Sequence, residues 1–396
     1  MIDNDQEFFM ITLQTPLFKK IETQAQSTPG CISFSQGALR VGGVPGAIRE
    51  YVREVLTSDK ADYYVNALGL MSLRERVAKY LLERHGAVVD PRSLFISHGS
   101  IGGLTTCLLG LLQVGDEVVL PAPTYPVYQN IVKMARAVPV FVQAMELKKN
   151  VMGQSVWTWN LEKVKASITP KTKMIIIANP SNPTGMALSK REIQELAQFC
   201  QEHKIYLMCD EVYEHFVFEG DFYSATELVA QYDYVIRLGS FSKNFAMSGW
   251  RVGFVVVPQS MMDLFAALQG ATVCCPSTIG QHAALYALDH PEVMQEQFLK
   301  VKKARDYAYN ALAPLVQSYG FEVAYPSASF YLFVKTPEVD STKFVFEVLE
   351  KAQVALAPGA DFGPFSSGYF RLCYAREFEL VQEGLTRLVR YVVSTR

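Results

Sequence analysis

No apolar run in the 396-residue sequence is long enough to cross a membrane. The most apolar stretch, residues 101–114, falls short of the roughly 20 residues that a spanning helix needs, and it predicts a buried helix instead. The start, MIDNDQEFFM, is acidic, whereas an export signal has a positive region followed by an apolar core. We therefore expect a cytoplasmic protein that does not act on a membrane.

Neither sign of charge is in excess. The 37 Lys and Arg residues face 39 Asp and Glu residues, which gives a formal net charge of −2, and no basic stripe stands out. Nucleic acid is therefore not an expected partner. The seven cysteines are scattered without a CxxC pair, as is typical of free thiols in a reducing compartment, and we expect no bound metal.

Two further absences narrow the architecture. The chain has no fixed-period repeat and no low-complexity segment, which excludes solenoids and linker-rich arrays. It has no G-x-G-x-x-G run between a predicted strand and helix, which disfavours a nicotinamide-dependent dehydrogenase. Hydrophobic residues make up 49% of the sequence, as in a globular protein. Its length exceeds the roughly 250 to 300 residues at which a single core stops growing, so two domains are expected.

Short apolar runs alternate with longer helical patterns over residues 70–260. This alternation is typical of βαβ units, which build an α/β fold with a mostly parallel central sheet flanked by helices. Several runs are apolar throughout, as strands buried on both faces must be. The predicted strands span residues 94–97, 117–120, 174–178, 205–209, 234–238 and 254–257, and the predicted crossover helices span residues 161–166 and 189–204.

The pattern changes after residue 271. Residues 277–312 predict one or two long helices, and strand-like runs follow at 329–334 and 370–374. We expect a large α/β domain over residues 46–285. Residues 1–45 together with 286–396 are expected to form a smaller α+β domain.

Polar residues follow three of the predicted strands. Asn182, Asp210, and the pair Ser240 and Lys243 each come shortly after an apolar run. Ligands of an open α/β sheet bind beyond the carboxyl ends of its strands. One crevice is therefore expected to collect all four side chains.

Several sequence runs carry a family resemblance. NPSNPTG stands at 179–185, DEVY at 210–213, SFSK at 240–243 and GWRVG at 249–253. In this order they resemble the class I and II aminotransferases of fold type I, which use pyridoxal phosphate. The resemblance covers nearly the whole chain and includes Tyr64, PTYP at 123–126, APG at 357–359 and FRL at 370–372.

The resemblance assigns the central roles to Lys243 and Asp210. Lys243 would hold pyridoxal phosphate as an imine and, once the substrate amine displaces it, would move the proton between the substrate Cα and the cofactor. Asp210 would keep the pyridinium nitrogen protonated. Taken alone, a lysine is usually exposed and Asp210 could cap a helix. Tyr213, three residues later, would then lie one helical turn away and face the same ligand.

The resemblance places two tyrosines and an asparagine around the cofactor ring. Tyr213 and Asn182 would hydrogen-bond the phenolic oxygen and so lower the pKa of the imine. Tyr125 would stack on the ring. Each has an ordinary alternative, because Asn182 before Pro183 is a good turn residue and either tyrosine could be core packing.

The run Gly99-Ser100-Ile101, just before a helix predicted near Gly102, could hold the cofactor phosphate with its backbone N–H groups. The resemblance adds Ser240 and Arg251 to this phosphate site. Tyr64 matches the tyrosine that reaches the phosphate of the neighbouring subunit, so the resemblance implies a homodimer.

Arg371 would clamp the substrate α-carboxylate with its bidentate guanidinium, although an arginine in a strand pattern is more often an exposed edge charge. Asn182 and Gly37 would add substrate contacts. Some family members that act on dicarboxylic amino acids carry a cation at the position of Ile101, and the aliphatic residue here disfavours an aspartate specialist. Arg40 could still meet a side-chain carboxylate.

The leading hypothesis is an aminotransferase that moves an amino group from an L-amino acid to a 2-oxo acid with pyridoxal phosphate. A lyase that eliminates a β- or γ-substituent on the same fold is the alternative, because it begins with the same proton abstraction. A non-catalytic protein that binds the cofactor as a sensor is disfavoured, because every catalytic position is filled. The expected partners are small-molecule amino acids and 2-oxo acids.

Overall fold

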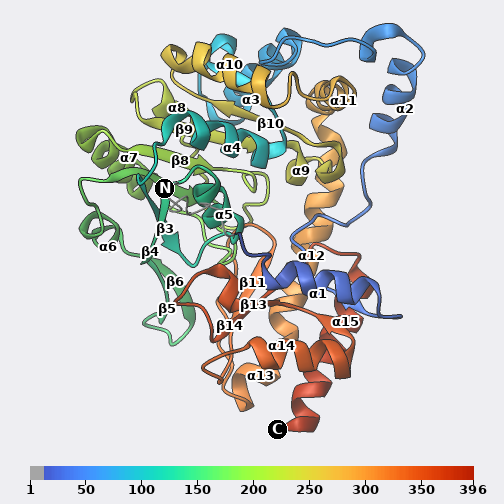
Figure 1. The fold of residues 1–396 in the computed structure, drawn as a ribbon. Coiled ribbons are helices and arrows are strands. Elements are labelled where there is room, and N and C mark those ends of the chain that lie inside the picture. The colour runs from blue at the N-terminus through green and yellow to red at the C-terminus, as the bar shows by residue number, and fades with distance from the viewer. Residues whose placement is uncertain (1–12) are drawn as a thin grey trace, which may run out of the picture.

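A seven-stranded sheet with the order β2-β10-β9-β8-β7-β3-β4 forms the centre of the upper part of the molecule in Figure 1. The computed structural model describes residues 13–396, and the acidic start of the chain lies outside the described residues. The strands are β2 (Leu94–His98), β3 (Glu117–Ala122), β4 (Val138–Gln143), β7 (Thr172–Ala178), β8 (Tyr206–Asp210), β9 (Val235–Ser240) and β10 (Val252–Val256).

The sheet is mostly parallel, which confirms the predicted fold class, and all six predicted strands are present. β10 runs antiparallel to both of its neighbours, β9 and β2. A parallel pair needs a crossover of a dozen or more residues, and the shorter connection from Ser240 to Val252 accounts for the reversal. β4 was not predicted, because it lies at the sheet edge and its side chains are only partly buried or exposed.

Helices cover both faces of this sheet, because alternate strand residues point to opposite sides. On one face, helix residues such as Leu108 and Phe265 share a core with Ile176 of β7. On the other face, Leu196 shares a core with the next strand residue, Ile177. The first face carries α4 (Gly99–Leu111), α5 (Val127–Met134) and α10 (Met262–Thr272), and the second carries α3 (Met71–His85), α6 (Leu161–Ala166), α7 (Lys190–His203), α8 (Thr226–Val229) and α11 (Thr278–Asp289).

The start of α7 and the end of α4 can be compared with the helices that the sequence predicts. Ser189 and Glu192 form a capping box at the start of α7, in agreement with the predicted helix start. The buried helix predicted over residues 101–114 is α4, which begins earlier and ends at Leu111. It ends there because Leu112 is extended and the backbone N–H of Gln113 bonds the Asp116 carboxylate in the turn before β3.

A smaller antiparallel sheet, with the order β11-β14-β13, lies below the central sheet in Figure 1. The helical region predicted over residues 277–312 is two helices, α11 and α12, separated by a 3-10 turn that begins at Pro291. The elements here are β11 (Tyr331–Lys335), β13 (Ala357–Pro358), β14 (Tyr369–Cys373), α12 (Gln295–Ala311), α13 (Ala313–Ser318), α14 (Thr342–Glu347) and α15 (Phe378–Thr395).

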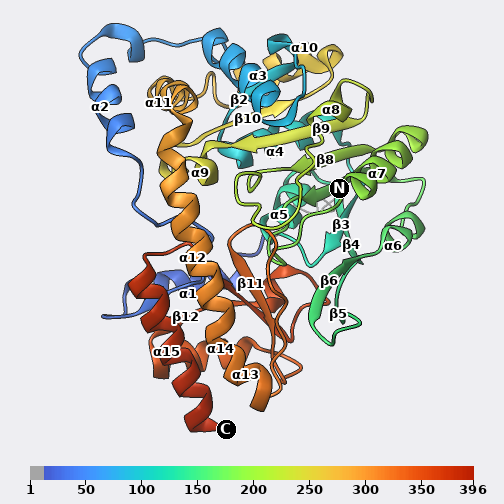
Figure 2. The same cartoon turned by 180° about the vertical axis from the view of Figure 1, so that it is seen from behind.

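The beginning of the described chain packs against its end. β1 (Ile32–Ser33) pairs in parallel with β12 (Val354–Ala355), and α1 (Leu17–Gln26) contacts β12 and β13 in the lower part of both views (Figures 1 and 2). α2 (Gly46–Val55) and the hairpin of β5 (Met145–Lys149) and β6 (Ser155–Trp159) complete the larger elements. Among residues 13–396, no helix combines the length and the apolar character needed to span a membrane.

Candidate active site

A cavity of about 430 Å³ lies at the carboxyl ends of β8 and β9, with a wall supplied by α1 and the smaller sheet. This is the edge of the central sheet where a ligand was expected. Ten of the thirteen predicted site residues line it, although they come from segments far apart in the sequence. They are Gly37, Ser100, Ile101, Tyr125, Asn182, Asp210, Tyr213, Lys243, Arg251 and Arg371.

Three predicted residues do not line the cavity. Ser240 is buried, and its Oγ accepts a hydrogen bond from the backbone N–H of Ser242 at 3.1 Å, while Ser242 itself reaches the cavity. Tyr64 is 84% exposed on the surface. Gly99 starts α4 with a positive φ of 69°, and a Cβ there would lie 2.2 Å from Arg251 Nη2. The glycine therefore lets the Arg251 guanidinium reach the start of this helix.

Lys243 and Asp210 are the titratable pair of the cavity. Burial lowers the pKa of Lys243 to about 8, and the nearby cations Arg371 and Arg251 act in the same direction. Burial raises the pKa of Asp210 to about 6, although the Tyr128 hydroxyl donates a hydrogen bond to its Oδ2 at 2.6 Å. The pKa values of both groups are thus shifted toward neutral pH, as is typical of residues that react or bind ions in clefts.

The backbone after Asp210 is a turn, so the predicted helical spacing to Tyr213 is wrong. The N–H of Glu211 bonds the Leu238 carbonyl of β9, which continues the sheet hydrogen bonding past the end of β8. The N–H of Phe216 then bonds the Tyr213 carbonyl across a tight turn. Asp210 and Tyr213 still face the same cavity, but the sheet and the turn place them there.

A chain of polar contacts crosses the cavity wall. Asn182 Nδ2 donates to the Tyr213 hydroxyl at 3.3 Å, and that hydroxyl lies 2.7 Å from the hydroxyl of Tyr331. Lys243 Nζ donates to the carbonyl of Gly37. A Cβ at Gly37 would lie 2.2 Å from the Tyr331 hydroxyl oxygen, so only glycine fits this close approach.

Arg371 is buried in β14 rather than exposed at a sheet edge. Its Nη1 donates to Asn182 Oδ1 at 2.9 Å, its Nη2 donates to the carbonyl of Ser35, and its Cζ lies 4.5 Å from the Tyr331 ring centre. Its Nε has no hydrogen-bond partner within the described part of the chain. A buried guanidinium held by neutral oxygens is suited to receive a carboxylate.

Arg251 has an unusual backbone conformation for a residue with a side chain. Its φ of 56° lies in the left-handed region, which non-glycine residues rarely adopt. Its Nη1 donates to the Ser248 carbonyl at 2.7 Å, and Ser248 and Gly249 also line the cavity. The strain is stored where the guanidinium meets the first residues of α4.

Several cavity residues escaped the sequence reasoning. Tyr331 looked like one more residue of an apolar strand, and Phe18 and Lys19 lie on a helix that gave no functional signal. Tyr128 could have been noticed, because it follows Tyr125 by three residues, its N–H bonds the Tyr125 carbonyl in the turn that leads into α5, and the two rings contact each other edge to face. Gln36, Ala38, Val212, Ser242, Ser248 and Gly249 are the other lining residues.

Arg40 does not line the cavity. Its Nη2 donates to Gln36 Oε1 at 2.6 Å and lies 3.6 Å from the Glu22 carboxylate. Its charge is therefore already engaged within the protein, which removes the support for a contact with a substrate side chain.

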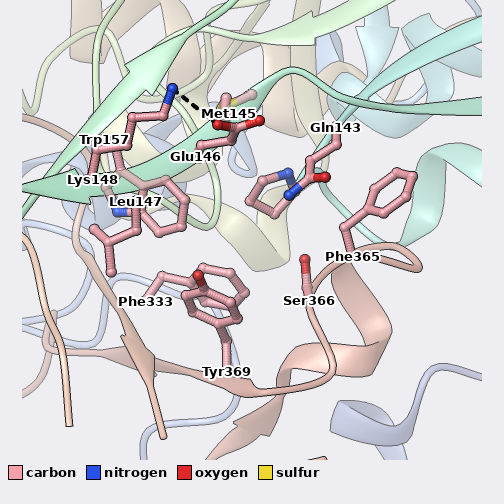
Figure 3. A pocket seen from close by; sticks show the side chains of 11 residues that line it. Gln143, Met145, Glu146, Leu147, Lys148, Trp157, Phe333, Phe365, Ser366 and Tyr369 are labelled. Carbon is pink, nitrogen blue, oxygen red and sulfur yellow. Dashed lines mark ion pairs between the residues drawn. The ribbon is translucent and has the colours of Figure 1, made fainter. Parts of the chain in front are cut away.

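A second, smaller cavity of about 190 Å³ lies between the β5–β6 hairpin and the smaller sheet (Figure 3). Phe333 and Tyr369 stack with ring centres 4.9 Å apart, and Trp157 packs against both. The ion pair between Lys148 and Glu146, at 3.0 Å, stands at its rim. Neither Lys243 nor Asp210 reaches this cavity, so the chemistry is assigned to the larger one.

Residues 29–388 match the protein family described as Aminotransferase class I and II. The match covers most of the chain, so the chain belongs to this family and is an aminotransferase. The predicted family, fold class and enzyme class are confirmed.

The relatives match this chain over nearly their whole length. A putative aminotransferase of Bacillus subtilis is 32% identical, and the match covers 91% of this chain and 93% of that protein. Aromatic-amino-acid aminotransferase 2 of Thermococcus litoralis is 30% identical, with 93% and 94% covered. Among solved structures, aspartate aminotransferase from Thermus thermophilus with maleate is similar with a TM-score of 0.85 and 27% identity, covering 96% of this chain and 97% of that one.

Proposed function

We propose that pyridoxal phosphate binds in the larger cavity at Lys243, and that the surrounding residues transfer an amino group from an L-amino acid to a 2-oxo acid. The observation that carries the proposal is the convergence of a partly buried lysine, a buried aspartate and a buried arginine without a carboxylate partner among the described residues on one cavity. When bound, the cofactor supplies an electron-withdrawing ring that stabilises negative charge at the substrate Cα.

The cavity fits the parts of this cofactor. The start of α4 offers backbone N–H groups to an anion, and Arg251 adds a positive charge beside them. We assign this end to the phosphate, with Gly99, Ser100 and Ile101 as backbone donors. Ser240 supports the site indirectly through its bond to the N–H of Ser242.

Lys243 Nζ is suited to bind the cofactor and to move a proton. With a pKa of about 8, about a tenth of the lysine is the neutral amine at pH 7, whereas an ordinary lysine is almost fully charged. The neutral amine can attack an aldehyde, and after its release it can accept the proton from the substrate Cα.

Asp210, Tyr213, Asn182 and Tyr125 would hold the ring. Asp210 faces the cavity from the end of β8, where a bound positive charge would lower its pKa and favour its ionised form further. The Tyr213 hydroxyl and the Asn182 amide can donate to a phenolate oxygen, and Tyr125 would stack on the ring.

Arg371, which lines the cavity and has no carboxylate partner among the described residues, would bind the substrate α-carboxylate through its guanidinium. Asn182 already contacts this guanidinium, and the Gly37 carbonyl accepts from Lys243, so both lie where a substrate would touch them. Fixing the carboxylate beside Lys243 orients the substrate Cα for proton transfer.

We also propose a homodimer in which Tyr64 reaches the phosphate of the neighbouring site. Its 84% exposure leaves the ring free for a partner subunit. A cytoplasmic location is supported by the seven free cysteines. The division into residues 46–285 as the large domain and residues 1–45 with 286–396 as the small one is supported by the β1–β12 pairing, although residues 1–12 lie outside the described part.

The test is to load the purified protein with pyridoxal phosphate and add single amino acids without an acceptor. The expected result is loss of the visible absorbance of the bound cofactor, formation of its amine form, and release of the matching 2-oxo acid. Release of ammonia without the amine form would instead favour the lyase. Lys335→Ala, at a lysine exposed on the smaller sheet, is the control and should behave like the wild type.

A further inference from the structure

A cluster of buried charged groups adjoins the cavity without opening into it. Arg237 of β9 lies at its centre, with Nε 3.0 Å from Glu211 Oε2 and Nη2 donating to Glu214 Oε2. His85 Nε2 lies 2.7 Å from the same Glu214 oxygen. The side chains of Arg237 and of both glutamates are at most 1% exposed, so the cluster is sealed from solvent.

Three residues of this region, Glu211, Glu214 and Asn244, are direct chain neighbours of cavity residues. Glu211 follows Asp210, and Glu214 follows Tyr213. Asn244 follows Lys243, and its Nδ2 donates to Glu214 Oε1 at 3.0 Å. At each of these points one residue faces the cavity and the next faces the cluster.

Lys243 stands on a very short helix, α9 (Phe241–Asn244). A single turn of helix has little stability of its own, so its position depends on tertiary contacts. The Asn244 side chain supplies one such contact, and the bond to Glu214 is its anchor, because Asn244 Oδ1 has no partner among the described residues.

The Glu214 carboxylate is itself held rigidly. Its Oε1 accepts from Asn244 and from the Tyr80 hydroxyl at 3.1 Å, and its Oε2 contacts Arg237 and His85. Burial alone would raise the pKa of Glu214, but Arg237 and His85 outweigh burial and hold that pKa well below its usual range. The anchor is thus an ionised group with four contacts, in one fixed orientation.

We propose that Glu214, oriented by Arg237, is a positioning residue that acts through Asn244 to hold Lys243 at the cavity. This inference rests on the proposed role of Lys243 as the residue that binds the cofactor. The cluster then has a functional effect beyond stability, although none of its members touches a ligand.

Two variants distinguish an effect on the position of Lys243 from an effect on the stability of the fold. Asn244→Leu and Tyr80→Phe each remove one hydrogen bond to the same oxygen, Glu214 Oε1, but only Asn244 adjoins Lys243. Both should lower the melting temperature. Only Asn244→Leu should displace Lys243, and a displacement of about 1 Å can cost up to about 100-fold in rate.

The experiment compares both variants with the wild type as cofactor-loaded enzymes. The first readout is the pH midpoint of the visible absorbance change, which reports the Lys243 linkage at equilibrium, and the second is kcat against KM. We expect Asn244→Leu to shift the midpoint and to lower kcat by about tenfold or more with a small change in KM. Tyr80→Phe should match the wild type in both readouts.

A double variant tests whether Glu214 acts on Lys243 through Asn244. If Glu214 acts through Asn244, Glu214→Gln combined with Asn244→Leu should lower kcat by less than the product of the two single effects. An Asn244→Leu enzyme with the midpoint and kcat of Tyr80→Phe overturns the inference. Should Asn244→Leu fail to fold, Asn244→Ala carries the same comparison. Absence of visible absorbance in the wild type would overturn the proposed function as well, which distinguishes the two failures.

Discussion

Arg371 and Arg237 are two fully buried arginines with different partners. Arg237 in β9 pairs with the carboxylates of Glu211 and Glu214. Arg371 in β14 donates only to neutral oxygens, of Asn182 and Ser35. Among residues 13–396, each arginine leaves one nitrogen without a hydrogen-bond partner, so the counter-charge and not the hydrogen-bond count distinguishes them. A buried charge is costly unless it is paired, so the charge of Arg237 is balanced by two carboxylates within the protein, whereas Arg371 is suited to an anion from outside.

The same difference separates the two regions around these arginines. In the cavity, burial moves the pKa of Lys243 and of Asp210 toward neutrality, because neither has a full counter-charge. In the cluster, Arg237 and His85 keep the pKa of Glu214 low despite burial. A missing counter-charge marks the groups that meet a ligand, and a close pair of opposite charges marks the groups of the buried cluster.

The strongest test of this contrast removes the lysine. In Lys243→Ala we expect kcat/KM for amino-group transfer to fall by at least about 10³-fold, because a positioned proton carrier alone contributes about 10²- to 10⁴-fold. The melting temperature should stay level or rise, since a poorly paired amine has been removed from the cavity. Initial rates and thermal melts of the cofactor-free chain measure the two effects. Retention of full turnover would refute the assignment of Lys243.

Arg237→Met should strongly destabilise the protein, unlike Lys243→Ala. Removal of one partner from a buried ion pair leaves an uncompensated charge, and the expected loss is about 3 to 5 kcal/mol in the free energy of unfolding. Arg191→Met is the matched control, because the Arg191 side chain is 86% exposed and pairs with Glu195 on the surface of α7. Its loss of unfolding free energy should be far smaller, because an exposed ion pair contributes little, and urea unfolding measures both variants. Equal losses in the two variants would contradict the paired character of the cluster.

Arg371→Lys should weaken substrate binding more than the fold. Lysine keeps the charge but loses the bidentate fork, so we expect KM for every amino acid to rise by about 10- to 100-fold, the equivalent of a charged hydrogen bond. Arg305→Lys is the control, because Arg305 is also buried but pairs with Glu219 and Asp306 outside the cavity. It should lower the melting temperature and leave KM unchanged. A KM that rises equally in both variants would argue against a carboxylate site at Arg371.

The smallest effect is a pH dependence of cofactor capture. Because burial lowers the pKa of Lys243 from 10.5 to about 8, the neutral amine becomes the main form above pH 8 and falls about tenfold per pH unit below it. The rate at which the cofactor-free chain gains visible absorbance with pyridoxal phosphate should follow this curve between about pH 6 and 9. A rate that still rises steeply toward pH 10 would indicate an ordinary, exposed lysine.

Much of the site was predictable because it follows local rules. Asn182, Asp210 and Lys243 stand after apolar strands, and the carboxyl ends of parallel strands share one edge of a sheet. The short sequence runs around them are long enough to be specific. The alternation of strands and helices likewise predicted the central sheet, since both its faces had to be buried.

The parts that escaped prediction depend on contacts between distant segments. The turn after Asp210 forms because the N–H of Glu211 bonds Leu238 of the next strand, and no local pattern encodes that bond. Tyr331 and Phe18 reach the cavity only because the smaller sheet and α1 close over it. Arg371 is buried by the same packing, although an isolated arginine in a strand suggests exposure.

The pairing of β1 with β12 sets an order for folding during synthesis. Ile32 pairs with Val354, so the first strand must wait for a partner made near the end of translation. At about 5 to 20 residues per second, the wait is on the order of tens of seconds. The strands of the central sheet, from β2 to β10, emerge in one continuous stretch before that. The central sheet can therefore assemble on the ribosome, whereas the smaller part, and with it the Arg371 wall of the cavity, is completed last.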